Sequence, residues 1–208
     1  VELYEVFFES FRNKKINILE IGVDNGDSLR LWSEYFTNAN ICGIDIKKKQ
    51  FQINKVNILC GDQSDELFLK SVVDKYRNFD IIIDDGSHVS KHIISSFNFL
   101  FKYLNKDGLY IIEDLQTSYI TRYGGSRVNL KKSNTSMNFI KKLTDSVNYE
   151  HYDRPFFRKT SYDGLIKSVQ FFQNIVFIRK GDSKKFFYPD KPKKTIFDFL
   201  KKFISLFY

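Results

Sequence analysis

The feature that most constrains the fold is a regular alternation of short apolar segments with stretches of helical periodicity. Near-continuous apolar segments of this length are typical of strands buried on both faces of a sheet. The alternation predicts an α/β fold, a mostly parallel sheet with helices on both faces. Strands are expected at residues 16–21, 40–46, 56–60, 79–83 and 108–112, and helices at 3–11, 28–36, 65–76 and 89–104.

After the fifth expected strand the alternation weakens. A helix is expected at about 135–145, and the pair of apolar segments at 165–172 and 175–179 predicts a C-terminal antiparallel hairpin. A charged, proline-containing linker follows, and then a segment with apolar residues at helical spacing. We therefore expect one folded domain at 1–181, with a basic linker and an amphipathic helix appended at 182–208.

The net charge of +8 is concentrated near the C-terminus. From Arg179 onward, nine Lys and Arg residues accompany three Asp residues, which leaves a net charge of +2 for the rest of the chain. Nucleic-acid binders spread positive charge over a folded face or groove, so we expect no nucleic-acid partner. The basic C-terminal helix is expected either to pack on its own domain or a second subunit, as in a homo-oligomer, or to lie on an anionic membrane surface.

The two cysteines and the lack of long apolar stretches indicate the cellular compartment of the protein. The two cysteines, Cys42 and Cys60, lie in apolar strand-like runs, as is usual for a reducing compartment. No apolar stretch approaches the ~20 residues of a transmembrane helix, and no signal-peptide pattern opens the sequence. We expect a cytoplasmic protein, held at the inner face of the membrane where the C-terminal helix binds lipid.

The turn after the first strand carries one acidic residue and two glycines, in the order Glu20-x-Gly22-x-x-x-Gly26. Glycines allow a ligand to approach the backbone closely, but this spacing differs from the dinucleotide fingerprint. A carboxylate here would repel a pyrophosphate, whereas it suits the ammonium and sulfonium groups of S-adenosylmethionine. For this turn alone, a tight turn without a ligand is the alternative.

Two later strand ends strengthen the case for this cofactor. Asp45 closes the second strand, where it is placed to accept hydrogen bonds from ribose hydroxyls. Asp62 and Gln63 follow the third strand, where they are placed to contact adenine. The alternative is that the two aspartates cap loops or helices. The expected cofactor site comprises Glu20, Gly22, Asn25, Gly26, Ser28, Asp45, Asp62, Gln63 and Asp84.

Four carboxylates and one histidine follow the fourth and fifth strands. They are Asp84, Asp85, His88, Glu113 and Asp114. Because these strand ends are expected to be neighbours, the negative charges would repel one another. A divalent cation such as Mg²⁺, bound by carboxylate oxygens and water, relieves that repulsion, while the lack of nearby thiols argues against zinc. His92 is interpreted as a surface or orienting residue.

Together these segments resemble the macrocin/mycinamicin family of sugar O-methyltransferases. The resemblance runs from about residue 4 to residue 181 and keeps the order and spacing of the segments. They are LEIG at 19–22, SLxxW at 28–32, GDQSD at 61–65, IDDGSH at 83–88, GLYIIED at 108–114 and YGG at 123–125.

This resemblance implies a Rossmann-like class I methyltransferase fold, Mg²⁺ dependence and methylation of a sugar hydroxyl. By the same resemblance Asp85, Glu113 and Asp114 match the metal ligands. His88 matches the catalytic base, and Asp85 is counted with it among the catalytic residues. The segment 125–163, where the acceptor pocket is expected, shows no clear match.

We therefore predict Mg²⁺-dependent methyl transfer from S-adenosylmethionine to a sugar, sugar-nucleotide or glycan acceptor. A composition rich in Lys, Asn, Phe and Ile favours a bacterial surface polysaccharide or glycan pathway. The alternatives are a catechol-type or other small-molecule O-methyltransferase, a related antibiotic-pathway hydroxylase and a non-catalytic glycan-binding protein. The complete set of carboxylates and histidine argues against the last of these.

Overall fold

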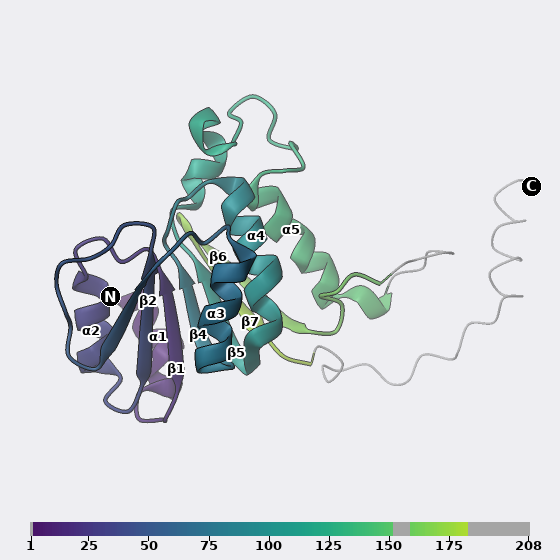
Figure 1. Cartoon of the computed structure of the whole chain (residues 1–208). Coiled ribbons are helices and arrows are strands. Elements are labelled where there is room, and N and C mark those ends of the chain that lie inside the picture. The colour runs from purple at the N-terminus through teal and green to yellow at the C-terminus, as the bar shows by residue number, and fades with distance from the viewer. Residues whose placement is uncertain (1, 152–158, 183–208) are drawn as a thin grey trace, which may run out of the picture.

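The computed structural model describes residues 2–151 and 159–182 (Figure 1). Its strands form one sheet in the order β3-β2-β1-β4-β5-β7-β6. Neighbouring strands from β3 to β5 are parallel, whereas β7 is antiparallel to both β5 and β6. The strands are β1 (Asn17–Ile21), β2 (Asn40–Asp45), β3 (Val56–Cys60), β4 (Phe79–Asp84), β5 (Leu104–Ile112), β6 (Ile166–Phe172) and β7 (Ile175–Lys180). The predicted α/β fold and its C-terminal hairpin are confirmed.

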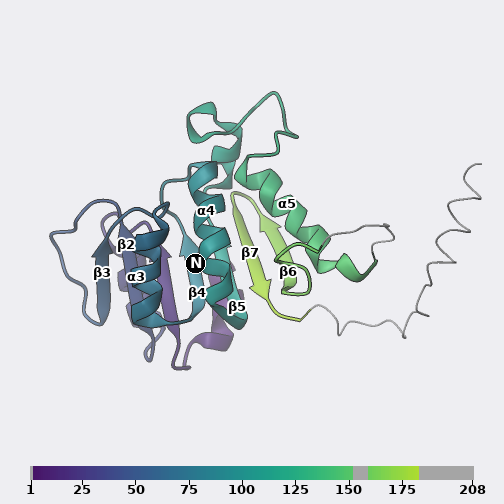
Figure 2. The ribbon, with the colours of Figure 1, turned by 45° about the vertical axis from the view of Figure 1, so that its right-hand side comes forward.

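Helices cover both faces of the sheet, so the structure has three layers (Figure 2). The first two helices lie on one face and the other three on the opposite face. They are α1 (Glu2–Phe8), α2 (Asp27–Tyr35), α3 (Glu66–Tyr76), α4 (Ser90–Leu100) and α5 (Ser136–Val147). Each was expected within a few residues of these bounds, because amphipathic spacing marks the body of a helix better than its ends.

Strand side chains alternate between the two apolar layers. On β1, Ile18 packs in the layer that contains Phe8 and Trp32, while Leu19 packs in the layer that contains Leu69 and Phe97. All six side chains are buried. Because both faces of the central strands are covered, both sets of alternating positions must be apolar, which explains the uninterrupted apolar segments.

The clearest difference from expectation lies before β5. The helix expected to reach residue 104 ends at Leu100, a 3₁₀ turn follows at Phe101–Tyr103, and β5 begins at Leu104. Leu104 pairs with Phe79, after which a register shift separates this pair from the rest of the β4–β5 ladder. Two more 3₁₀ turns, Leu115–Tyr119 and Thr121–Tyr123, occupy the stretch where no element was expected.

The expected C-terminal helix lies outside the described residues, as does the linker from residue 183 onward. The proposed division at residue 181 therefore stays a prediction, and so do the alternative roles of the tail. Among the helices that the structure describes, none combines the length and the apolar character that crossing a bilayer requires.

Local capping can be tested at α3, which packs on the sheet beside the end of β3. Asp65 is exposed and accepts hydrogen bonds from the backbone N–H groups of Leu67 and Phe68. We expect Asp65→Ala to lower the free energy of unfolding by about 1 kcal/mol, because two helix N–H groups lose their acceptor. Urea denaturation measures this. Asp65→Asn, which keeps an acceptor, should stay close to wild type, and equal losses in both variants would contradict the capping role.

Candidate active site

Backbone pairing brings the ends of β1, β4 and β5 side by side. Asp84 pairs with Ile21 on one side and Ile112 on the other. The next residues continue these contacts: the Asp85 N–H donates to the Ile21 carbonyl (2.9 Å), and the Glu113 N–H donates to the Asp84 carbonyl (3.0 Å). The residues that follow the strands are therefore held together, as the sequence predicts for parallel strands.

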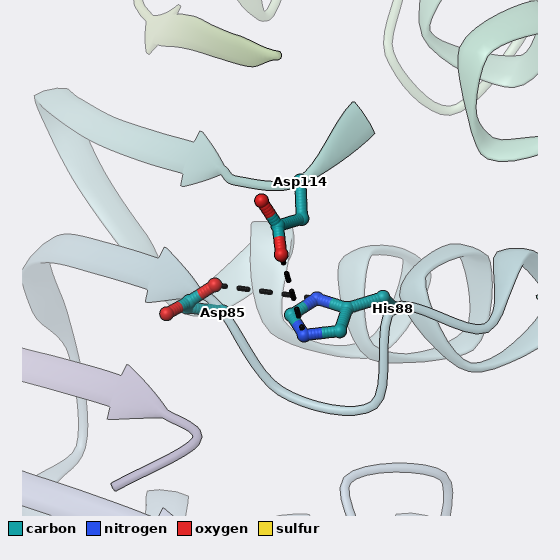
Figure 3. A group of neighbouring side chains, drawn as sticks. All are labelled: Asp85, His88 and Asp114. Atoms are coloured by element: carbon teal, nitrogen blue, oxygen red, sulfur yellow. Dashed lines mark ion pairs between the residues drawn. The ribbon is translucent and has the colours of Figure 1, made fainter. Parts of the chain in front are cut away.

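Three of the predicted residues form a compact cluster, Asp85, His88 and Asp114 (Figure 3). One potential ligand atom from each lies within 4.8 Å of the others. The Nε2 atom of His88 lies 3.6 Å from Oδ2 of Asp114, and its Nδ1 atom lies 4.0 Å from Oδ1 of Asp85. All three side chains are partly exposed, so a ligand can reach them.

The backbone is unusual at two members of this cluster. His88 and Asp114 have φ angles of 57° and 52°, in the left-handed region that residues other than glycine seldom adopt. The Thr117 hydroxyl lies 3.1 Å from the His88 carbonyl and 2.7 Å from the Asp114 carbonyl, and so links the two turns. Strained backbone of this kind persists where the surroundings hold it, often at functional sites.

Electrostatics set Asp85 apart from ordinary surface carboxylates. Burial and, after it, the negative charges of Glu113 and Asp114 together raise the pKa of Asp85 to about 7. A bound cation would relieve this repulsion, and a set of two carboxylates and one imidazole is compatible with a divalent ion.

Glu113 stands beside the cluster, where it is hydrogen-bonded to the Tyr4 hydroxyl of α1. Burial raises the pKa of both groups. Nothing in the sequence marks Tyr4 as part of the site, since it lies 109 positions from Glu113 and belongs to no recognised motif.

Asp84 does not join the other carboxylates, so the expected convergence of all four is wrong at this position. Asp84 is buried, where it accepts hydrogen bonds from the Ser96 hydroxyl (2.7 Å) and the Gln63 amide (3.0 Å). Burial raises its pKa. As the last residue of β4, Asp84 has a side chain that points into the layer of α3 and α4, and any part it has in a donor site is indirect, through Gln63.

A cleft follows the C-terminal ends of β1, β2 and β3, where the cofactor site was expected. Four of the predicted residues line it, Gly22, Asp45, Asp62 and Gln63. Ser87 and His92 line it too, although neither was predicted to do so.

The two aspartates of the cleft are held in the ionised form. Burial raises the pKa of Asp45, but hydrogen bonds from Lys49, Lys47 and two further backbone N–H groups outweigh this and lower it. The backbone N–H and hydroxyl of Ser64 each donate to Oδ1 of Asp62 at 2.8 Å, and they lower the pKa of Asp62. Ionised carboxylates at these points can accept hydrogen bonds from ligand hydroxyl and amino groups.

Gly22 is required by the crossing of two turns. Its φ angle is +91°, and a Cβ atom at this position would lie 2.2 Å from the backbone oxygen of Asp85. Any side chain here would push the turn after β1 away from the turn after β4. Gly22 therefore keeps the cleft and the carboxylate cluster adjacent.

The remaining predicted cofactor residues lie outside the lining of this cleft. Glu20 is buried, and it accepts hydrogen bonds from the Ser28 hydroxyl (2.5 Å) and the indole N–H of Trp32 (2.6 Å). The Asn25 amide donates to Asp27, and Gly26 precedes α2 with a φ angle of +82°. Direct contact of Glu20, Asn25, Gly26 or Ser28 with a donor stays a prediction.

A second cavity, of about 510 Å³, lies between α1 and α2. Aromatic side chains that include Tyr4 and Trp32 form its walls, and Asp85 and Glu113 also line it. The turn after β4 therefore separates two spaces, since Asp85 lines this cavity and the next two residues line the cleft.

The chain is similar to known methyltransferases in both sequence and structure. No family model matches the chain. Demethylmacrocin O-methyltransferase of Streptomyces fradiae is 35% identical over 187 residues, which is 86% of this chain and 47% of that protein. The 8-demethyl-8-alpha-L-rhamnosyl tetracenomycin-C 2'-O-methyltransferase of Streptomyces olivaceus is 36% identical over 186 residues, 85% of this chain and 49% of that protein. The chain spans about half the length of these relatives.

Solved structures of methyltransferases are similar to this chain as well. MycE methyltransferase from the mycinamycin biosynthetic pathway, in complex with Mg and SAH, has a TM-score of 0.86 and 31% identity over 96% of this chain and 53% of that chain. A complex of the same enzyme that also contains mycinamycin VI has a TM-score of 0.85 over 97% of this chain and 54% of that chain. These matches confirm the predicted resemblance and the class I methyltransferase fold. None of these names refers to a surface polysaccharide, so the comparisons do not support that expected role.

The buried Glu20 predicts a specific dependence of stability on pH. Burial raises the pKa of Glu20 to about 7, from an ordinary value of 4.5, so folding favours its protonated form. The wild type should therefore lose stability relative to Glu20→Gln as the pH rises from 4.5 to 7, by up to about 3 kcal/mol.

Urea denaturation of both proteins across this pH range measures the difference. Glu34→Gln, on the exposed side of α2, is the matched control and should differ from wild type by the same amount at every pH. A difference between wild type and Glu20→Gln that does not change with pH would contradict the account of Glu20.

Proposed function

Over its matched residues this chain belongs to the macrocin/mycinamicin family of sugar O-methyltransferases, and we propose that it transfers a methyl group from S-adenosylmethionine to a sugar hydroxyl with a divalent metal ion. The relatives' names and the Mg and SAH in MycE support this proposal. SAH is the product that S-adenosylmethionine leaves after methyl transfer.

The observation that carries the proposal is the position of the turn after β4. It separates the cleft from the second cavity, and it bears Asp85 and His88 of the carboxylate cluster. A donor in the cleft and an acceptor in the second cavity would meet at this turn. Methyl transfer needs such a meeting point, because donor, methyl group and attacking oxygen must lie in line.

The residues that would hold the metal are Asp85 and Asp114, with Glu113 as the third ligand that the family resemblance implies. Their crowded negative charge and partly exposed oxygens suit a hard divalent cation. When bound, S-adenosylmethionine supplies the methyl group and the cation lowers the pKa of a sugar hydroxyl. In the structure Tyr4 occupies one oxygen of Glu113, which leaves the other oxygen for this role.

His88 is assigned the part of general base. Its ring nitrogens lie 3.6 and 4.0 Å from oxygens of Asp114 and Asp85, and these carboxylates stabilise the imidazolium that forms when the ring accepts the hydroxyl proton. The linkage through Thr117 holds the backbone of His88, so the ring stays beside Asp85 and Asp114.

The acceptor is proposed to be the sugar of a glycoside that enters the second cavity. Rings such as Tyr4 and Trp32 offer apolar faces against which a sugar can pack, and Asp85 and Glu113 offer oxygen atoms to its hydroxyls. The relatives are named for glycosylated natural products, and a surface glycan is the finer form of the proposed acceptor. A cytoplasmic location with peripheral membrane contact also stays a proposal.

Metal removal tests the proposed function. The protein is incubated with ¹³C-methyl S-adenosylmethionine and three separate acceptors, a rhamnoside, a surface-type oligosaccharide and a catechol, and products are measured by mass spectrometry. We expect methylation of the rhamnoside that EDTA abolishes and added Mg²⁺ restores, because the crowded carboxylates then regain their cation. Methylation of the catechol alone would contradict the sugar acceptor, and full turnover in EDTA would contradict the metal.

The role of His88 predicts a separation of binding from turnover. We expect His88→Ala to lower kcat by roughly 10²–10⁴-fold, because the hydroxyl proton loses its acceptor. SAH affinity, measured by calorimetry, should stay within about threefold of wild type, since His88 does not line the donor cleft. His88→Ala with a wild-type kcat would rule out general-base catalysis by this residue.

A further inference from the structure

His92 lies in the donor cleft, not among the solvated residues where the sequence places it. It is the third residue of α4 and is partly buried. Asp62, Gln63 and Ser87 line the same cleft. By contrast Lys91, its neighbour on the helix, is exposed and lines none of the cavities described above.

A chain of hydrogen bonds runs from the buried Asp84 to His92. The Gln63 amide nitrogen donates to Asp84 (3.0 Å), and the Gln63 amide oxygen accepts from the Ser87 N–H (2.7 Å). The Ser87 hydroxyl then lies 3.0 Å from Nδ1 of His92. The ring is therefore anchored through partners that reach into the core, which a merely solvated histidine would lack.

The partners of Ser87 allow its hydroxyl to be the donor in the last hydrogen bond, and we assign this direction. Its hydroxyl oxygen already accepts from the Val89 N–H (3.3 Å), so its hydrogen is available for Nδ1 of His92. In neutral imidazole one ring nitrogen accepts and the other donates. With the Ser87 hydroxyl donating to Nδ1, the ring hydrogen is on Nε2, so in this assigned tautomer His92 has an N–H donor to offer in the cleft.

The neighbouring carboxylate offers the opposite group. Both hydrogen bonds from Ser64 fall on Oδ1 of Asp62, so within the described residues Oδ2 keeps its capacity to accept. The cleft thus presents a donor on His92 and an acceptor on Asp62. Adenine carries the complementary pair, an amino group that donates and adjacent ring nitrogens, N1 and N7, that accept.

We propose that His92 recognises the adenine of the methyl donor by donating its Nε2–H to a ring nitrogen next to the amino group, with Ser87 as the residue that orients it. This inference rests on the proposed function, since it takes the cleft to be the donor site. It assigns to His92 and Ser87 a part in donor selectivity that lies apart from the carboxylate cluster.

Calorimetric titration of the full chain with three ligands tests the proposal, namely SAH and its 1-deaza and 7-deaza adenine analogues, each of which lacks one ring nitrogen. We expect the wild type to bind one of the two analogues about tenfold more weakly than SAH, through loss of one hydrogen bond. His92→Ala should bind SAH about tenfold more weakly than wild type, with no further loss for that same analogue.

Controls separate this result from a change of fold. Lys91→Ala should bind all three ligands as the wild type does, and His92→Asn, which keeps an N–H donor, should recover part of the lost SAH affinity. Ser87→Ala should reduce the preference for SAH over the sensitive analogue, because the imidazole loses its orienting partner. Thermal denaturation of each variant without ligand monitors stability.

The possible failures are distinguishable. Wild-type SAH affinity in His92→Ala would overturn the proposal, as would an equal further loss for the sensitive analogue in that variant. A wild-type protein that binds both deaza analogues as tightly as SAH would also overturn it, while leaving the proposed function standing. A wild-type protein that binds no SAH would contradict the proposed function itself.

Discussion

The crowding of carboxylates at the ends of β4 and β5 is the constraint around which the site is arranged. Backbone hydrogen bonds fix these residues as neighbours, so the charges cannot separate without breaking the sheet. Two of these carboxylates accept hydrogen bonds from the protein. Asp84 accepts them from Ser96 and Gln63 in the core, and Glu113 accepts one from the Tyr4 hydroxyl. Asp85 and Asp114 remain partly exposed and face His88, and a divalent cation would neutralise their negative charge.

Packing on one face of the sheet connects stability with this site. The Tyr4 ring lies 5.0 Å from Phe8, 5.2 Å from Trp32 and 5.6 Å from Phe177, measured between ring centroids. These contacts hold the Tyr4 hydroxyl against Glu113, while the Trp32 indole also donates to the buried Glu20. The aromatic layer therefore positions a carboxylate of the site besides filling the core, and α1 becomes part of the second cavity.

Two kinds of feature can be predicted from the sequence: elements that show a hydrophobic periodicity, and residues at the ends of parallel strands, which meet at one edge of the sheet. That logic finds the strands, the cleft residues Asp45 and Asp62, and the meeting of Asp85 with Asp114. It fails at Asp84, where the strand's alternation turns the side chain inward although it stands next to Asp85. It also misses Tyr4 and His92. The hydrogen bond of Tyr4 to Glu113 joins segments that are far apart in the sequence. The position of His92 in the cleft depends on the turn after β4, in which His88 has a left-handed conformation.

We propose that Asp85 and Asp114 form one divalent-cation site, and Mn²⁺ binding followed by electron paramagnetic resonance tests this most directly. We expect one bound ion per wild-type chain and an Mn²⁺ affinity at least about tenfold lower in Asp114→Asn, which removes a ligand charge. Asp27→Asn, an exposed carboxylate on α2, should bind as the wild type does. Equal Mn²⁺ affinity in wild type and Asp114→Asn would contradict the claim.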